Sequence, residues 1–153
     1  MLEKKFIDLA IKEAEKALQK GEVPVGSVLV KDGKVIAKSH NQRISKNNAL
    51  YHAEIVAIEK ACKKLKSWRL DDCILYTTLE PCLMCAGAIM QARIKKVVFL
   101  AKDEKGGAIV SKYTVFDDKK LPFNVEYQYI HDERAEKLLK EFFKFLRNSK
   151  KSF

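Results

Sequence analysis

The stretch from residue 73 to residue 101 reads CILYTTLEPCLMCAGAIMQARIKKVVFLA, and it decides the fold. The apolar run 73–78 predicts a strand that is broken by Glu80-Pro81, and residues 82–92 predict a helix. The run 96–101 is continuously apolar, which is typical of a strand that is buried on both faces. Strand, helix and strand in this order form a βαβ unit, so we expect the two strands to be parallel.

The residues before this unit predict a helix and an antiparallel pair of strands. Residues 3–19 repeat apolar side chains at helical spacing, and Gly21 follows as a stop. Residues 23–30 are rich in β-branched side chains, and Asp32-Gly33 predicts a hairpin turn into a second strand at 35–37.

The remaining segments complete a layered domain. Residues 41–51 predict a polar loop, and 52–65 predict a helix. Residues 103–124 are irregular, residues 125–130 alternate like a strand, and Asp132 is a suitable N-cap for a last amphipathic helix. The sum is an α/β fold of three layers, a mixed sheet of about five strands with helices on both faces.

The length and composition favour one domain in the cytoplasm. The chain has 153 residues, which predicts a single domain over 1–153. No apolar run approaches the ~20 residues of a membrane span. The first residues mix charge with apolar side chains and contain no continuous apolar segment of the kind that signal peptides have.

The charge suggests a polyanionic partner. The formal net charge is +10, and residues 134–151 contain seven basic and two acidic side chains. A basic surface of this kind suits nucleic acid. A lysine-rich surface that only keeps the protein soluble is the alternative.

Four cysteines fall into two groups. Cys62 and Cys73 lie in apolar, patterned segments, and we expect both to be small buried core residues. Cys82 and Cys85 form a Cys-x-x-Cys pair, and in a cytosolic protein such a pair more often binds metal or does chemistry than forms a structural disulfide.

Two short motifs at predicted helix starts form a ligand set. They are His52-Ala53-Glu54 and Pro81-Cys82-Leu83-Met84-Cys85. One histidine nitrogen and two thiolates leave the fourth position of tetrahedral Zn²⁺ open for water, which is typical of a catalytic zinc. Free N–H groups at helix starts stabilise thiolates. A redox Cys-x-x-Cys protein is the alternative for the cysteines.

Glu54 is the candidate proton shuttle. Residues i and i+2 do not share a face in the middle of a helix, but in the first turn both can approach an object beyond the N-terminus. A carboxylate there can take a proton from zinc-bound water and pass it to a substrate. The alternative is an acidic residue that only satisfies the helix dipole.

The pairing of His-x-Glu with Pro-Cys-x-x-Cys is the known signature of zinc-dependent nucleobase deaminases. The chain resembles the bacterial tRNA-specific adenosine deaminases over roughly residues 3–147. The segments that carry the resemblance are Pro24–Val30, Asn41, His52–Ile55, Thr78–Ala88, Arg93-Ile94, Val97–Phe99 and Glu141–Arg147.

The resemblance implies a three-layer cytidine-deaminase-like fold, a homodimer and one Zn²⁺ per subunit. It implies zinc ligands His52, Cys82 and Cys85, with Glu54 as catalytic proton shuttle. It implies substrate contacts from Asn41 to the flipped base and from the segment Ala101-Lys102-Asp103 beside the target nucleotide, with Asp103 at its sugar or backbone. It also implies contacts from Phe143, Lys144 and Arg147 to the anticodon stem-loop. The plainer alternatives are a loop-turn role for Asn41 and core packing for Phe142 or Phe143.

Two segments depart from the usual pattern of the family. Members usually read Asp-Pro-Thr before the zinc histidine, where this chain has Asn48–Tyr51. Many members also have small residues where this chain has Ile109 and Val110, and we expect both departures to lie near the rim of the substrate site.

The implied activity is deamination of adenosine to inosine at the wobble position of tRNA. A free-base or free-nucleoside deaminase, such as a guanine deaminase, shares the same two motifs and is the main alternative. A zinc protein without activity that positions tRNA for a partner is a further alternative, although such a protein has no need of Glu54.

Overall fold

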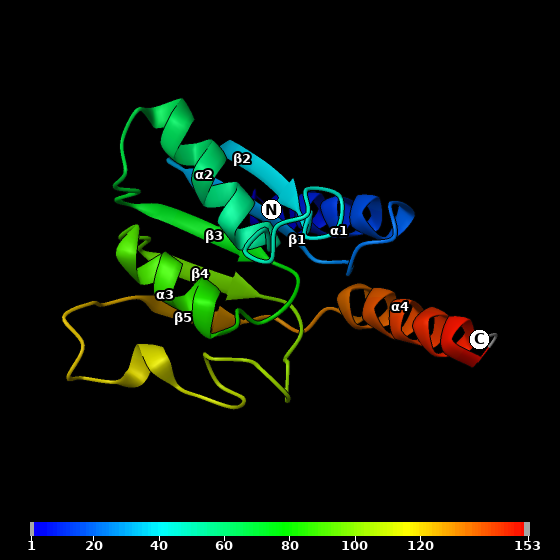
Figure 1. Cartoon of the computed structure of the whole chain (residues 1–153). Helices are drawn as coiled ribbons and strands as arrows, with labels where there is room; N and C mark the ends of the chain where they lie inside the picture. Colours follow the sequence, from blue (N-terminus) through cyan, green and yellow to red (C-terminus); the bar gives the residue numbers. More distant parts are fainter. Residues whose placement is uncertain (1, 152–153) are drawn as a thin grey trace.

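The helices and strands follow the order that the sequence predicts (Figure 1). The computed structural model describes residues 2–151, with side chains described from 3 to 149. The elements are α1 (Leu2–Gln19), β1 (Gly26–Lys31), β2 (Lys34–His40), α2 (Ala53–Leu65), β3 (Cys73–Thr77), α3 (Leu83–Gln91), β4 (Lys96–Phe99), the short 3-10 helix η1 (Val115–Asp117), β5 (Glu126–Tyr129) and α4 (Glu133–Lys151).

Five strands form one mixed sheet in the order β2-β1-β3-β4-β5. β1 is antiparallel to β2 and β3, whereas β3, β4 and β5 run parallel, which confirms the predicted βαβ unit. The start of β1 therefore lies beside the ends of β2 and β3: Gly26 pairs with His40, and the N–H of Thr78 donates to the Gly26 carbonyl oxygen at 3.0 Å. The segments that follow β2, β3 and β4 meet at this edge, called the carboxyl edge below.

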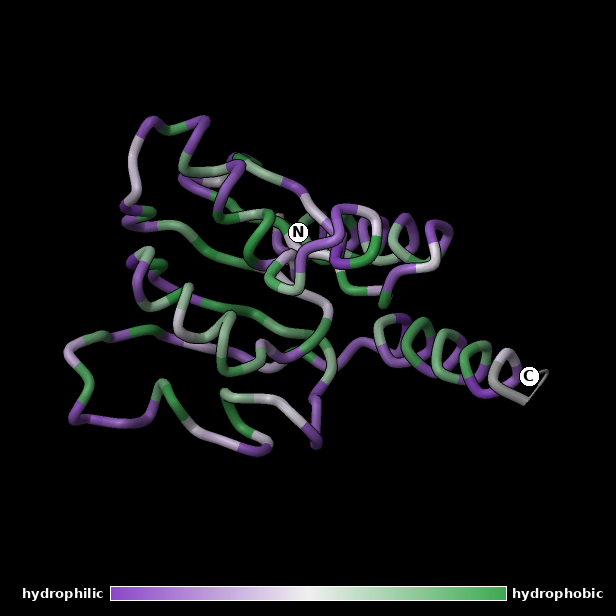
Figure 2. Tube along the Cα trace, viewed as in Figure 1, coloured by the Kyte–Doolittle hydropathy of each residue, from purple (hydrophilic) through white to green (hydrophobic). Residues whose placement is uncertain are grey.

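The sheet separates two apolar layers, as its alternating side chains require. Leu75, Val97 and Phe99 pack toward α2 and α3, while their neighbours Tyr76 and Val98 pack toward α1 and the first turn of α4. Figure 2 shows the hydrophobic colouring along the central strands, between the helices. This arrangement confirms the predicted fold class of three layers with helices on both faces.

The first strand begins later than predicted. Pro24 has no N–H to donate to a sheet, and β1 begins at Gly26 instead of Val23. β2 in turn continues past Ala37 to His40, because its last residues pair with the start of β1. A Cβ on Gly26 would lie 2.1 Å from the carbonyl oxygen of Ala10, so the close packing of β1 on α1 requires glycine.

The two cysteines predicted for the core differ in burial. Cys73 on β3 is fully buried, as expected. Cys62 is only half-buried, because it lies near the end of α2, at the margin of the core, with its Sγ 3.8 Å from the carbonyl oxygen of Trp68. The prediction of a buried Cys62 was therefore wrong.

Helix α4 reaches beyond the sheet (Figure 1). Asp132 caps it as predicted, because its Oδ1 accepts the N–H of Arg134 at 2.9 Å. The apolar stripe expected along the helix is buried only in part: Ala135 and Phe142 are buried, whereas Phe143 and Leu146 are exposed. The outer half of α4 thus presents apolar and basic side chains on the surface of the described chain. No helix in residues 2–151 is long and apolar enough to cross a membrane.

Candidate active site

Helices α2 and α3 both begin at the carboxyl edge. His52 immediately precedes α2 and Cys82 immediately precedes α3, each with an extended backbone. The Ser39 hydroxyl on β2 donates to the carbonyl oxygen of Ala53 at 2.6 Å and fixes the first turn of α2 to the sheet. The sheet order therefore places the two predicted motifs opposite one another.

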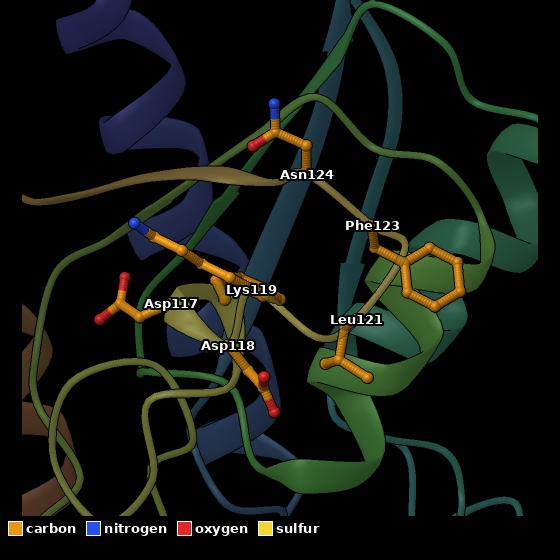
Figure 3. A pocket seen from close by; sticks show the side chains of 7 residues that line it. Asp117, Asp118, Lys119, Leu121, Phe123 and Asn124 are labelled. Atoms are coloured by element: carbon orange, nitrogen blue, oxygen red, sulfur yellow. The ribbon is translucent and has the colours of Figure 1, made fainter.

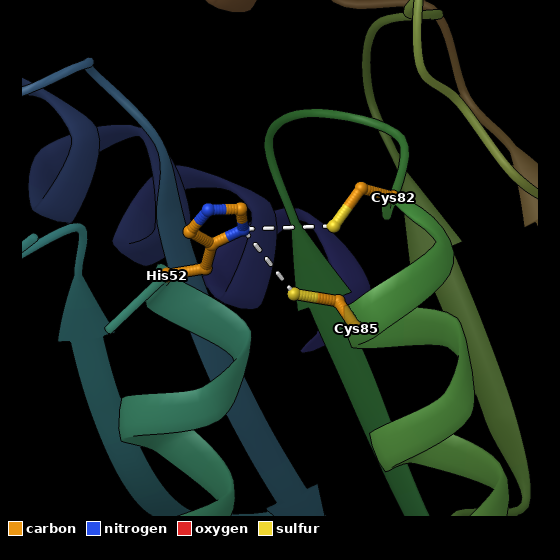
Figure 4. Close-up of side chains that lie close together, drawn as sticks. All are labelled: His52, Cys82 and Cys85. Carbon is orange, nitrogen blue, oxygen red and sulfur yellow. Dashed lines mark hydrogen bonds between the residues drawn. The ribbon is translucent and has the colours of Figure 1, made fainter. Parts of the chain in front are cut away.

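The side chains of His52, Cys82 and Cys85 point toward one another (Figure 4). The Nδ1 of His52 lies 3.6 Å from the Sγ of Cys82 and 3.5 Å from the Sγ of Cys85. The three possible ligand atoms all lie within 4.8 Å of one another, so this group could hold a metal ion. The structure thus brings together the three residues that the sequence predicts as ligands.

The two thiols of this group differ in acidity. A hydrogen bond from Cys85, helped by His52 and opposed by burial, lowers the pKa of Cys82 to about 4. The same thiol–thiol hydrogen bond and burial raise the pKa of Cys85. The hydrogen bond to Cys82 raises the pKa of His52 above its usual value. The group therefore already contains one thiolate, which favours a bound cation.

Glu54 reaches the same group from the first turn of α2. Its side chain is buried, and burial raises its pKa to about 7 despite the attraction of His52. The Cys85 thiol hydrogen-bonds to this carboxyl group. The first-turn geometry expected from the sequence is therefore present, with the carboxyl group beside the possible metal ligands.

His52, Cys82 and Glu54 line a pocket of about 510 Å³. Its remaining walls come from the segment before β1, the loops after β2, β3 and β4, and helix α4. Apolar side chains on these walls are Val23, Val25, Leu79, Leu139 and Phe143. The pocket therefore joins an apolar wall to one buried acid and a possible metal site.

Most of the predicted residues near the base line this pocket. Asn41 and Asp103 do so, and the Oδ1 of Asn41 also accepts the N–H of Arg43 at 2.9 Å. Asn41 therefore forms the loop turn and faces the pocket at once. Ala101 does not line the pocket: its side chain is buried in the core, and its carbonyl oxygen accepts the N–H of Glu80.

Comparison with known proteins agrees with this site. A family model described as MafB19-like deaminase matches residues 1–147. The tRNA-specific adenosine deaminase of Aquifex aeolicus (strain VF5) is 45% identical over 144 residues, 94% of this chain and 95% of that protein. A chain solved in work on A-to-I editing by tRNA:A34 deaminases has a TM-score of 0.81 at 42% identity and covers 83% of this chain and 98% of that chain. The chain belongs to the MafB19-like deaminase family.

The family resemblance predicted from the sequence is thus confirmed. The deaminase also resembles a guanine deaminase from Bacillus subtilis, with a TM-score of 0.63 and 36% identity over 95% of this chain and 93% of that chain. Both relatives have the same fold, so the fold alone does not choose between an RNA base and a free base.

The residues of this deaminase that are predicted to contact RNA from helix α4 lie partly at the pocket and partly outside it. Phe143 is 48% exposed and lines the pocket, while Phe142 is 5% exposed, which confirms that one of the two phenylalanines belongs to the core. Lys144 and Arg147 are exposed on the same helix and do not line the pocket.

Sequence reasoning missed two of the three basic residues at the pocket. Arg43, Lys102 and Lys105 line it, and the charge of Arg43 acts to lower the pKa of His52. Lys102 belongs to the segment that the resemblance places beside the target nucleotide, whereas Arg43 and Lys105 lie in irregular loops and carry no such signal. Ile109 is a correction: it is fully buried, not at the rim, because its N–H donates to the buried Glu80.

Two other hollows of this deaminase are larger, at about 590 and 730 Å³, and residues 112–124 line them. Figure 3 shows the first of these, with Asp117, Asp118 and Lys119 on its wall. Neither hollow contains a residue of the His52 group or a buried acid, so the pocket at the carboxyl edge is the candidate active site.

Proposed function

We propose that this deaminase converts adenosine to inosine at the wobble position of a tRNA, with water as co-substrate and ammonia as second product. The observation that carries the proposal is the buried Glu54, with a pKa of about 7, beside the His52, Cys82 and Cys85 group in a pocket. The names of the relatives at 45% and 42% identity support the substrate.

We propose that the three ligands hold one zinc ion per chain. Bond lengths of about 2.0 Å to nitrogen and about 2.3 Å to sulfur place tetrahedral ligands about 3.5 Å apart. The observed separations of 3.5 and 3.6 Å fit this value, and a redox pair does not explain why His52 faces both thiols. When bound, zinc supplies a water molecule whose pKa is lowered toward neutrality.

Glu54 then moves the protons of the reaction. It accepts one proton from the attacking water and donates it to a ring nitrogen of adenine as the bond from oxygen to C6 forms. It then takes the remaining proton of the new hydroxyl group and donates it to the amino group, which leaves as ammonia when the bond from C6 to that nitrogen breaks. A carboxyl group with a pKa of about 7 can hold and release a proton near neutral pH. Its burial keeps these transfers away from bulk solvent.

The pocket suits a base that has left its stack. Its volume of about 510 Å³ lies in the range of small-ligand sites. We place the adenine against the apolar wall with Asn41 at its edge, and Asp103 beside the sugar or backbone. A loop nucleotide reaches such a pocket at lower cost than a paired one, which favours an anticodon loop.

The basic residues supply affinity for the RNA backbone. Lys144 and Arg147 are exposed on α4, and Arg43, Lys102 and Lys105 line the pocket mouth. Contacts of this kind are independent of sequence and weaken as salt rises. The side chains of Lys150 and Lys151, which the charge count includes, lie outside the described part.

The family resemblance supports a homodimer in which a second copy covers exposed apolar residues beside the site. Leu83, next to Cys82, is 50% exposed, and Leu50, two residues before His52, is 56% exposed. Leu83→Glu should therefore shift the sedimentation of the protein from dimer to monomer.

One sheet shared by both core layers supports a single domain over 1–153, and a tRNA substrate supports a cytoplasmic location.

A guanine deaminase is the second candidate, because the similar structure from Bacillus subtilis is named as one. The charge of +10 and the basic, exposed half of α4 argue against it, since a small neutral base gains nothing from such a surface.

One experiment separates the two candidates. The zinc-loaded protein is incubated with an anticodon stem-loop that carries a wobble adenosine, with free guanine and with free adenosine, and Glu54→Gln is the control. We expect inosine in the RNA only when Glu54 is present. Ammonia from guanine with unchanged RNA would contradict the proposal and identify a nucleobase deaminase.

A further inference from the structure

Glu80 lies in the segment that joins β3 to α3, and only 2% of the residue is exposed. Its carboxylate accepts hydrogen bonds from a single loop. Its Oε1 accepts the N–H of Asp103 at 3.1 Å, and its Oε2 accepts the N–H groups of Ile109, Val110 and Ser111 at 3.0, 2.8 and 3.0 Å. The Ser111 hydroxyl donates to Oε1 as well. No basic side chain of the described residues forms an ion pair with Glu80, so these loop donors hold its charge.

The segment 101–111 closes around this carboxylate. The N–H of Glu80 donates to Ala101 at 2.9 Å, and the N–H of Ala108 donates to Pro81 at 2.8 Å. Gly107 is buried directly against the carboxylate: a Cβ at this position would lie 2.3 Å from the Cδ of Glu80. A side chain at this position would therefore displace the Glu80 carboxylate or the loop that binds it.

The same segment forms one wall of the active-site pocket. Residues 102–105 line the pocket, and this stretch includes Lys102, Asp103 and Lys105. These residues have no regular secondary structure to hold them. Their position depends on the two ends of the segment, which are Ala101, two residues after β4, and the cluster of N–H groups on Glu80.

We propose that Glu80 is a positioning residue. It holds residues 102–105 of the pocket wall in the position where they contact the nucleotide that carries the flipped base. The inference rests on the proposed function, because it concerns how RNA is held. Glu80 also lines the pocket, but both of its carboxylate oxygens accept hydrogen bonds from the loop. It acts through Lys102 and Asp103, and its loss should weaken RNA binding more than it slows the chemical step.

Adjacent glycines provide a matched pair of variants. Gly107→Ala places a methyl group in the space that the Glu80 carboxylate occupies. The methyl group of Gly106→Ala would lie 3.7 Å from the Oδ2 of Asp103, which is an ordinary contact. Glu80→Gln removes the charge directly and replaces one acceptor by a donor that faces N–H groups. The measurements are zinc content, melting temperature, hydrogen exchange in 102–111, and single-turnover kinetics on the stem-loop with half-saturation and maximal rate separated.

Gly107→Ala and Glu80→Gln should raise the half-saturation concentration about tenfold and leave the maximal rate within about threefold, because the wall and not the proton shuttle is displaced. Hydrogen exchange in 102–111 should accelerate in both, with full zinc content. Gly106→Ala should behave as the unmodified protein.

Two results overturn the inference, and they differ from failure of the proposed function. Gly107→Ala could match Gly106→Ala in half-saturation, or its maximal rate could fall with its zinc content while half-saturation stays constant; either result reduces Glu80 to a stabilising group. If instead the unmodified protein leaves the stem-loop unchanged, the proposed function itself fails, while the exchange data still report whether Glu80 holds the loop.

Discussion

The starts of helices α2 and α3 and the outer half of α4 contribute to the same pocket, yet they are built in opposite ways. Glu54 and Cys85 are buried, and the Ser39 hydroxyl fixes the first turn of α2 to the sheet. Phe143 and Lys144, by contrast, are exposed on a helix that reaches beyond the sheet (Figure 1). Groups that move protons need fixed distances, whereas groups that bind a flexible polyanion need reach and charge.

This contrast separates catalysis from binding along the chain. Figure 2 shows both hydrophobic and hydrophilic colours within the turns of α4, which differs from the hydrophobic colouring of the central strands. Substitutions at the helix starts should therefore alter rate with little change in RNA affinity, and substitutions on α4 should do the reverse. Each prediction below would break or sharpen that division.

The largest effect should follow Glu54→Gln. Without its proton shuttle the enzyme should lose about 10³-fold in maximal single-turnover rate, the size typical of a general acid–base group. The affinity for the stem-loop and the zinc content should change little, since Glu54 is not a proposed ligand and meets only the target base of the stem-loop. A rate within tenfold of the unmodified protein would remove Glu54 from the mechanism, and a parallel loss of RNA affinity would break the division.

The neighbours Phe142 and Phe143 should respond in opposite ways. Phe142 is 5% exposed, so Phe142→Ala should lower the free energy of unfolding by about 3 kcal/mol with RNA affinity unchanged. Phe143→Ala should weaken RNA binding by about 1–3 kcal/mol through lost base stacking, with an unchanged melting temperature. Denaturant titration measures the effect on stability, and RNA titration measures the effect on affinity. The control is Phe145→Ala, because Phe145 is exposed and does not line the pocket. Equal loss of stability in both variants would place Phe143 in the core.

Removing charge from α4 should have a smaller effect on affinity. Lys144→Ala with Arg147→Ala should weaken stem-loop binding about tenfold at low salt and reduce the slope of log affinity against log salt by about 1.4, at roughly 0.7 for each phosphate contact to a single strand. The maximal rate should not change.

The matched control for that variant is Lys63→Ala with Lys64→Ala, which removes the same charge from the far end of α2. If both double variants lower affinity equally, net charge and not α4 attracts the RNA.

The smallest effect concerns the free energy of unfolding at low pH, to which the buried Glu22 contributes. Glu22 is 1% exposed and accepts the N–H groups of Ile44 and Ser45 at 2.9 and 2.7 Å. Burial opposes them, but these hydrogen bonds hold the pKa of Glu22 below its usual value of 4.5. Because the folded-state pKa is lowered, the stabilisation is complete above pH 4.5 and is lost as pH falls through the folded pKa.

Glu22→Gln should therefore flatten the loss of stability in urea titrations between about pH 5 and pH 3. Glu15→Gln, at an exposed position of α1, should keep the full dependence on pH. An unchanged slope in Glu22→Gln would show that other carboxyl groups govern acid unfolding.

The elements and the ligand set could be predicted because both depend on local patterns. Alternating apolar runs give strands, and His52 and the Cys-x-x-Cys pair are short motifs at helix starts. The pocket walls could not be predicted in the same way. Arg43 and Lys105 lie far apart in sequence, and only the strand order β2-β1-β3-β4 brings their loops to one edge.

Burial in loops and exposure on helices were also beyond the sequence pattern. Ile109 is buried because Glu80, 29 residues earlier, accepts hydrogen bonds from the N–H groups of the segment around Ile109. The apolar period of α4 predicts a stripe, but it does not say where the sheet beneath ends, and Leu146 in this stripe is exposed. Both cases concern contacts between distant segments.

The sheet also has an edge that takes no part in chemistry. There β1 and β2 join through Asp32 and Gly33, a tight exposed turn with φ angles of 51° and 73°. The strand directions place this turn at the opposite end of the sheet from the pocket. It is accordingly a natural attachment point, where an inserted peptide, a fluorescent label or a surface tether leaves the pocket side of the molecule free.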